Sequence, residues 1–107
     1  MNKSENRRKQ ATFLTLMALL DSPKHGYEVA KFIEERSNGF FRMPFGTLYP
    51  ILHGLEKLGL VTVEVKEEKT GRPKKIYKLT RAGKLQAQGE VEEFQHFSRA
   101  IHRMVPA

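Results

Sequence analysis

The 107-residue sequence predicts a mainly α-helical fold with one small β-hairpin, an α+β class. Two observations predict it. Apolar residues recur at helical spacing in four segments, and two short segments of strand character lie between the third and the fourth. The chain is long enough for one modest hydrophobic core, so we expect a single compact domain.

The first two helices are expected over residues 4–20 and 26–37, separated by the stop signal Asp-Ser-Pro at 21–23. Ser4 is the expected cap of the first helix. Ser-Asn-Gly at 37–39 suits a left-handed cap after the second. The first helix carries a basic run and then an apolar face: Arg7, Arg8, Lys9, Phe13, Leu16, Met17 and Leu20.

Residues 40–45 are rich in aromatic side chains but have no helical period, and they contain a proline. We expect a turn whose aromatic side chains are buried. In the preceding helix, we expect Gly26 to permit the close approach of another helix and the ring of Tyr27 to fill the core.

The third helix, expected over residues 46–58, has the clearest pattern in the chain. Thr47 is its expected cap, and Pro50 is expected in the first turn, where a missing amide donor costs nothing. Gly59 is expected to end it. Its core face is predicted to be Leu48, Ile51, Leu52, Leu55 and Leu58.

A β-hairpin and a long last helix are expected next. Alternating valines at 61–65 and a second segment at 75–79 predict two half-buried strands, joined by a charged loop over 67–74. Thr80 is the expected cap of a helix over 81–104. The cations of the hairpin are Lys66, Lys69, Arg72, Lys74, Lys75 and Lys78.

The last helix carries an apolar seam, which we define as Val91, Phe94, Phe97, Ile101 and Met104, with Ser98 and Val105 as alternatives at two of its positions. A helix of about twenty residues is ~30 Å long and outruns so small a domain. A second copy of the chain is therefore the expected cover, with Phe13 and Met17 joining the dimer interface.

Some of these apolar side chains can equally line a pocket for a small apolar or aromatic effector, because aromatic and Met side chains adapt to flat ligands. The expected pocket residues are Phe13, Met17, Phe94 and Phe97.

Three helices, a hairpin and a further helix occur in this order in the winged helix-turn-helix, in which the hairpin is the wing. We expect residues 1–82 to form such a domain and residues 83–107 to form a C-terminal dimerisation helix. The nineteen Lys and Arg residues against twelve Asp and Glu leave a net charge of +7. This balance favours a polyanion, and double-stranded DNA is the expected partner.

Other classes of protein are disfavoured. No apolar run approaches the ~20 residues of a membrane span, so we expect a soluble, cytoplasmic protein. The sequence has no cysteine, only one aspartate, no glycine-rich phosphate loop, and four histidines at spacings that do not suit a metal site. We expect no enzymatic activity, no catalytic residue, no metal and no cofactor.

Three motifs occur in order: His-Gly-Tyr-Glu at 25–28, Gly-Thr-Leu-Tyr-Pro at 46–50, and Gly-Arg-Pro-Lys-Lys-Ile-Tyr-Lys-Leu-Thr-Arg-Ala-Gly at 71–83. With Leu-Glu-Lys-Leu-Gly-Leu at 55–60, they closely resemble the PadR family of transcriptional regulators over roughly residues 11 to 84. The resemblance implies a winged-helix homodimer that binds an operator, usually as a repressor relieved by a small molecule or signal. The short C-terminal part resembles the subgroup with one dimerisation helix. The sequence departs from the family at 43–45, Met-Pro-Phe, where many members have a Ser-Pro pair.

Carried over by position, the resemblance places Thr47, Tyr49 and Pro50 in the opening of the recognition helix and residues 71–74 in the wing. A tyrosine hydroxyl can bond a phosphate or a base edge, and His53 lies one turn beyond Tyr49. The expected DNA contacts are Thr47, Tyr49, Pro50, His53, Lys69, Gly71, Arg72, Lys74 and Lys75. Two alternatives stay open: a winged-helix module that binds another protein, and a ligand sensor.

Overall fold

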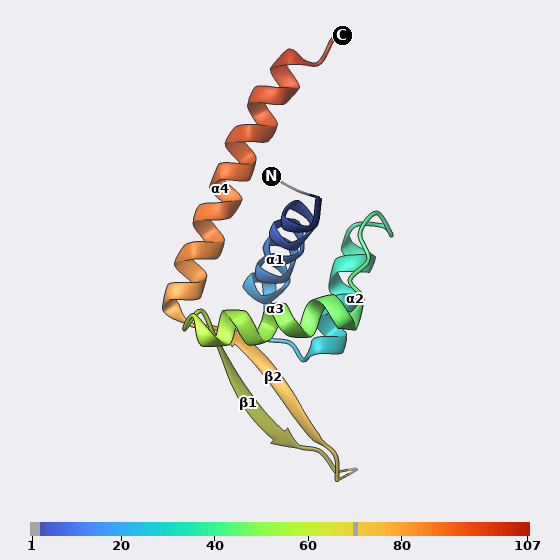
Figure 1. Ribbon diagram of the computed structural model, residues 1–107, viewed down its shortest axis with the longest axis vertical. Helices are drawn as coiled ribbons and strands as arrows, with labels where there is room; N and C mark the ends of the chain where they lie inside the picture. Colours follow the sequence, from blue (N-terminus) through green and yellow to red (C-terminus); the bar gives the residue numbers. More distant parts are fainter. Residues whose placement is uncertain (1–2, 70) are drawn as a thin grey trace.

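The computed structural model describes residues 3–69 and 71–107; Thr70, in the predicted loop, lies outside the described residues. The elements follow in the order α1 (Lys3–Asp21), α2 (Gly26–Arg36), α3 (Phe45–Lys57), β1 (Val61–Glu67), β2 (Pro73–Leu79) and α4 (Arg81–Met104). Figure 1 shows α1, α2 and α3 grouped together, with the hairpin and α4 extending away from them in opposite directions. The predicted winged helix-turn-helix and its α+β class are confirmed.

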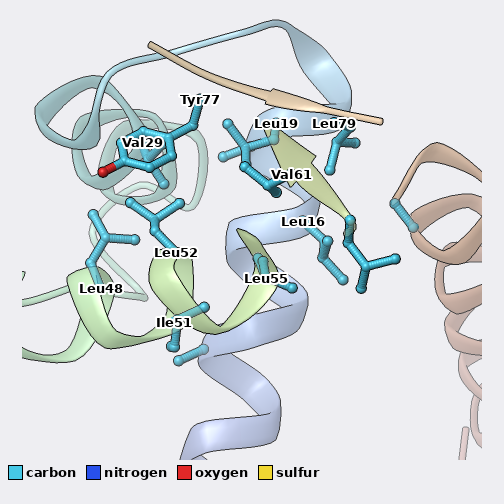
Figure 2. Close-up of a cluster of buried hydrophobic side chains, with 14 of the residues drawn as sticks. Leu16, Leu19, Val29, Leu48, Ile51, Leu52, Leu55, Val61, Tyr77 and Leu79 are labelled. Atoms are coloured by element: carbon cyan, nitrogen blue, oxygen red, sulfur yellow. The ribbon is translucent and has the colours of Figure 1, made fainter. Parts of the chain in front are cut away.

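The hydrophobic core lies where α1, α2, α3 and the base of the hairpin meet (Figure 2). Four of the five predicted apolar residues of α3 are buried there, because residues three and four apart share one face of a helix. The fifth, Leu58, is 73% exposed and lies outside the core. The labelled core side chains are Leu16, Leu19, Val29, Leu48, Ile51, Leu52, Leu55, Val61, Tyr77 and Leu79.

A buried lysine joins α1 to the hairpin. The ammonium group of Lys24 donates to the Ala18 carbonyl and to the Asp21 carboxylate, both at 2.8 Å. The backbone of Lys24 pairs with Tyr77 in β2 through two hydrogen bonds of 3.0 and 2.8 Å. A free carbonyl at the end of α1 is thereby satisfied.

Two predicted helix starts are wrong. Helix α3 begins at Phe45 with Pro44 as its cap, because the Pro44 carbonyl accepts the N–H groups of Thr47 and Leu48 at 3.0 Å. Thr47 therefore lies inside the first turn instead of capping it, and Pro50 is the sixth residue of the helix. Ser4 likewise lies inside α1, which begins at Lys3.

Of the aromatic residues predicted to be buried in the connector 40–45, only Phe41 packs against the core, and it is partly buried. Phe40 is 81% exposed and Phe45 is 46% exposed, whereas Met43 is the buried side chain of this connector. Tyr27, expected in the core, is 58% exposed. The left-handed end of α2 is confirmed, since Asn38 and Gly39 have φ angles of 51° and 79°.

The hairpin β1–β2, which we call the wing, is longer than predicted and its connecting turn is shorter. Val61 pairs with Leu79 at the base, and Glu67 pairs with Pro73 at the far end. Burial of alternate side chains holds only near the base, where Val61 is buried, while Val65 is 58% exposed. The outer part of the wing therefore projects beyond the core (Figure 1).

Helix α4 has the predicted bounds and the predicted cap. The Gly83 N–H donates to the Thr80 hydroxyl at 3.0 Å. Gly83 and Ala87 are buried against the body of the domain, whereas every residue beyond Ala100 is exposed. A Cβ atom on Gly83 would collide with the Leu60 carbonyl, so only glycine allows α4 to leave the wing at this angle.

Candidate nucleic-acid interface

The face of α3 that does not contact the core is exposed. The predicted contact residues Thr47, Tyr49, Pro50 and His53 all lie on this side. The opposite face holds Leu48 and its buried neighbours, so the core fixes the orientation of the helix. The helix can therefore present polar side chains to a partner without losing core contacts.

Tyr49 is held in place by two neighbours. Its ring lies 5.9 Å from the ring of Phe45, measured between centroids. A Cβ atom on Gly26 would lie 2.8 Å from the Tyr49 hydroxyl oxygen, so the absence of a side chain at the start of α2 makes room for this ring. The close approach expected at Gly26 thus involves one side chain of α3, and Tyr49 keeps 40% of its surface exposed.

A cleft of about 310 Å³ joins α3 to the wing and to the start of α2. The His25 N–H donates to the Glu28 carboxylate at 3.2 Å at its α2 border, where Glu28 completes a capping box. The exposed face of α3 and the wing therefore form one continuous surface. The residues that line the cleft are His25, Gly26, Tyr27, Tyr49, Pro73, Lys74, Lys75 and Tyr77.

The cations of the wing differ in how they are paired. Lys74 forms an ion pair of 2.8 Å with Glu68, and this hydrogen bond raises the pKa of the lysine above its ordinary value. Lys69, Arg72 and Lys75 are exposed and form no ion pair with any described residue. Gly71, at a φ of 80°, donates its N–H to the Glu68 carbonyl and closes the turn.

A row of neighbouring aromatic rings on the surface was not predicted from the sequence. The ring of Tyr27 lies 6.5 Å from that of Phe45, which in turn neighbours Tyr49, and His25 stacks on Tyr27 at 6.0 Å. Phe45 occupies one of the positions where the sequence departs from the Ser-Pro pair of many PadR proteins. No local sequence pattern distinguishes Phe45 from a core residue.

The predicted effector residues lie between α1 and α4. The rings of Phe13 and Phe94 are 5.9 Å apart, and a groove of about 300 Å³ is lined by Phe13, Glu90, Glu93, Phe94 and Phe97. Met17 is 38% exposed and is not among the residues that line the groove. The structure thus brings three of the four predicted residues together and adds two carboxylates.

The described part of the chain holds no group of three or more His, Asp or Glu side chains that could bind a metal ion. Among these residues, no helix is both long enough and apolar enough to span a membrane.

The fold occurs in solved transcriptional regulators. A transcriptional regulator from Clostridium thermocellum is 24% identical with a TM-score of 0.79, and the match covers 99% of this chain and 100% of that one. A PadR family transcription regulator from Clostridium difficile is 26% identical with a TM-score of 0.77, over 90% of this chain and 98% of that one.

Bacillus subtilis PadR, solved in complex with operator DNA, is 25% identical with a TM-score of 0.68. The match covers 75% of this chain and 44% of that longer one. An uncharacterized protein from Lysinibacillus sphaericus is 27% identical over 94% of this chain and 93% of its own length.

Residues 15–89 match the Transcriptional regulator PadR-like family, which is most of the chain. The members of this family are regulators and not enzymes, in agreement with the sequence prediction. The chain belongs to the PadR-like family of transcriptional regulators.

Proposed function

We propose that this protein is a homodimeric, sequence-specific DNA-binding repressor that acts in the cytoplasm. The observation that carries the proposal is the surface shared by α3 and the wing. An exposed helix face lies beside three exposed cations that no described residue neutralises, Lys69, Arg72 and Lys75. On such a surface the helix face can contact base edges in a DNA groove, and the cations can contact the phosphates beside it.

Helix α3 enters the major groove in this proposal. The groove is about 12 Å wide and admits one α-helix. Tyr49 and His53 lie one turn apart on the exposed face, where a hydroxyl and an imidazole can bond base edges or phosphates. Thr47 and Pro50 contact the sugar-phosphate edge of the same groove.

The wing contacts the adjoining backbone or minor groove. Arg72 is the cation that enters the minor groove, where narrow A·T tracts attract a guanidinium group. Lys69, Gly71 and Lys75 contact phosphates, and Lys74 does so less, because Glu68 holds its ammonium group. The operator complex of the Bacillus subtilis relative supports this use of the fold.

The α4 seam supports dimerisation. Within one chain, Phe97 is 64% exposed and Met104 is 76% exposed, although both are large apolar side chains. Two seams that pack across a two-fold axis remove this surface from water and place two α3 helices on one duplex. In this arrangement residues 1–82 bind DNA and residues 83–107 dimerise.

An effector site is the second function that a specific observation favours. The groove beside Phe13 and Phe94 borders the proposed dimer interface, so a flat ligand bound there can change the angle between two DNA-binding domains. We expect flat aromatic compounds to raise the melting temperature of the protein and Phe94→Ala to abolish this shift. A broad panel without any shift contradicts the site.

Selection of duplexes from a random DNA pool at ~150 mM salt tests the proposed function, because non-specific cationic binding weakens steeply by then. We expect enrichment of an inverted repeat. A folded protein that enriches no sequence contradicts the proposal and favours a module that binds another protein.

The wing is tested by comparing two variants on the selected operator. Arg72→Ala should weaken binding more than Lys74→Ala, because Lys74 is already paired with Glu68. Each lost phosphate contact should lower the slope of log affinity against log salt by about 0.9. Equal and unchanged affinities and slopes for both variants contradict the assignment of the wing.

A further inference from the structure

We propose that Arg7 and Arg8 of α1 bind phosphates of the operator on the side of α3 opposite the wing. The inference rests on the proposed function and adds a third DNA-contacting element to α3 and the wing. Neither arginine was among the DNA contacts expected from the sequence.

The two arginines lie beside the first turns of α3. A groove of about 330 Å³ separates the two helices there. Both arginines are exposed, and so are the neighbouring Thr47 and Pro50. The residues that line the groove are Ser4, Arg7 and Arg8 from α1 and Gly46, Thr47, Pro50 and Ile51 from α3.

This groove and the wing-side cleft flank opposite edges of the exposed face of α3. Thr47 lines the groove beside α1, whereas Tyr49 lines the cleft beside the wing. Residues two apart on a helix point about 200° apart around its axis. Figure 1 shows α1 and the wing on opposite sides of α3. Cations therefore flank the exposed helix face on both edges.

A helix in the major groove has a phosphate backbone on each side. The wing lies on the Tyr49 side of α3, toward one of these two backbones. The backbone beside Thr47 faces the two arginines, whose guanidinium groups can bond phosphate oxygens in pairs. The positive charge of the two arginines and their position beside α3 both indicate that the second phosphodiester strand of the operator binds here.

The charges of these arginines are available for such a contact. Neither Arg7 nor Arg8 forms an ion pair with any residue in 3–69 or 71–107. Arg36 and Arg42, in contrast, lie 3.8 Å from Asp21 and 3.3 Å from Glu34. The molecule therefore leaves cations unneutralised beside α3 while it pairs cations near the outer part of α2.

The two arginines differ in their second neighbours. Arg8 also lines a second groove together with Glu90 of α4, and Arg7 does not line that groove. The Glu90 carboxylate accepts a hydrogen bond from Gln86 at 3.2 Å. A carboxylate near Arg8 competes with phosphate for its guanidinium group, so Arg7 should contribute more of the affinity.

The experiment measures operator affinity against salt for the full-length protein and for Arg7→Gln with Arg8→Gln. We expect the double variant to bind at least about tenfold more weakly at ~150 mM salt and to lower the salt slope by about 0.9 for each lost phosphate contact. Arg7→Lys with Arg8→Lys should restore most of the slope, because the charge is kept. The control is Arg99→Gln with Arg103→Gln, which removes the same charge from the distal half of α4.

A second measurement locates the contact. Uncharged methylphosphonate linkages are placed on one strand or the other beside each half-site, and affinity is measured for both proteins. We expect the arginine variant to lose its defect on duplexes neutralised along one strand, and Lys75→Ala, at a proposed phosphate contact of the wing, to lose its defect when the other strand is neutralised. This non-additivity reports a direct contact, which a folding defect does not mimic.

The outcomes separate this inference from the proposed function. If the wild-type protein enriches no operator, the proposed function fails first. If the wild-type protein binds its operator and the arginine variant matches it in affinity and salt slope, α1 does not contact DNA. A defect of equal size in the α4 control shows that only net charge matters, and this result also overturns the inference.

Discussion

The two halves of α4 differ in how their apolar side chains are covered. Ala87, in the first half, is 2% exposed against the body of the domain, whereas Phe97 in the second half is 64% exposed. The first half of this helix therefore packs against the core. The apolar side chains of the second half are covered by no other described part of the chain. The difference shows where the chain completes its own fold and where large apolar side chains stay exposed, on the surface that we propose pairs with a second copy.

The covered half of α4 depends on one glycine. Gly83→Ala should lower the free energy of unfolding by about 3 kcal/mol, because the added methyl group meets the Leu60 backbone, which cannot move as a side chain can. Gly89→Ala is the matched control. Its Cβ meets nothing within 4 Å, so it should be neutral or stabilise the helix. Thermal or denaturant unfolding measures both, and equal values contradict this account of how α4 is docked.

Substitutions in the exposed half of α4 should change dimerisation of the protein. Ile101→Glu should raise the dissociation constant of the dimer at least about a hundredfold, because an unpaired carboxylate cannot be buried cheaply between two seams. Gln95→Glu adds the same charge at an exposed position outside the seam, about 120° around the helix from Ile101, and should leave assembly unchanged. Analytical ultracentrifugation provides the measurement. If both variants dimerise like the wild type, the seam is not the interface.

A substitution at Gly26 should affect the proposed DNA-contacting surface without affecting the stability of the core. Gly26→Ala should displace the Tyr49 ring and weaken operator binding about tenfold, within the 1–3 kcal/mol range of a lost specific contact. Stability should change little, because the obstructing atom is the far end of an exposed side chain. In a Tyr49→Ala background the Gly26→Ala change should have no further effect. Fluorescence anisotropy with labelled operator measures the cycle, and simple additivity contradicts the coupling.

The smallest expected effect concerns the junction between α1 and the wing. The hydrogen bond from Lys24 holds the pKa of the Asp21 carboxyl below its ordinary value of 3.8. Since the folded state lowers this pKa, the carboxylate stabilises the fold above pH 3.8, and the contribution is lost as the pH falls through the lower, folded value.

The difference in unfolding free energy between wild type and Asp21→Asn should therefore be constant above about pH 5 and shrink below it. Denaturant unfolding across this range measures the difference. If the difference in unfolding free energy grows as the pH falls, the proposed role of Lys24 is contradicted.

Periodic patterns with local caps were predictable from the sequence. The bounds of α4 follow from Thr80, whose hydroxyl accepts the Gly83 N–H, and from an apolar seam that keeps its period to Met104. The core face of α3 was also predictable up to Leu55. Leu58 continues the same pattern but is exposed, because α3 ends at Lys57 and the chain turns at Gly59, where φ is 74°, so that Leu60 is the next buried side chain.

Features that depend on contacts between distant segments could not be predicted. Lys24 is buried because a helix end, Asp21 and the Phe32 ring surround it, and no local pattern announces such a site. The outer parts of the two wing strands were predicted to be loop, because their side chains are polar. Backbone hydrogen bonds between the strands hold them together, and these are not visible in the side-chain pattern. Phe45 was expected in the core because apolar residues usually are, yet it stacks beside Tyr49 on the surface.

The central claim is that the exposed seam of α4 pairs two copies so that two α3 helices read one operator. The most direct test compares binding of the wild-type protein and of Ile101→Glu to the full inverted repeat and to an isolated half-site. The account predicts that the wild type prefers the inverted repeat at least about a hundredfold, since linked half-sites add their contacts, and that the variant binds both duplexes alike. The same preference for the full repeat in both proteins would contradict it.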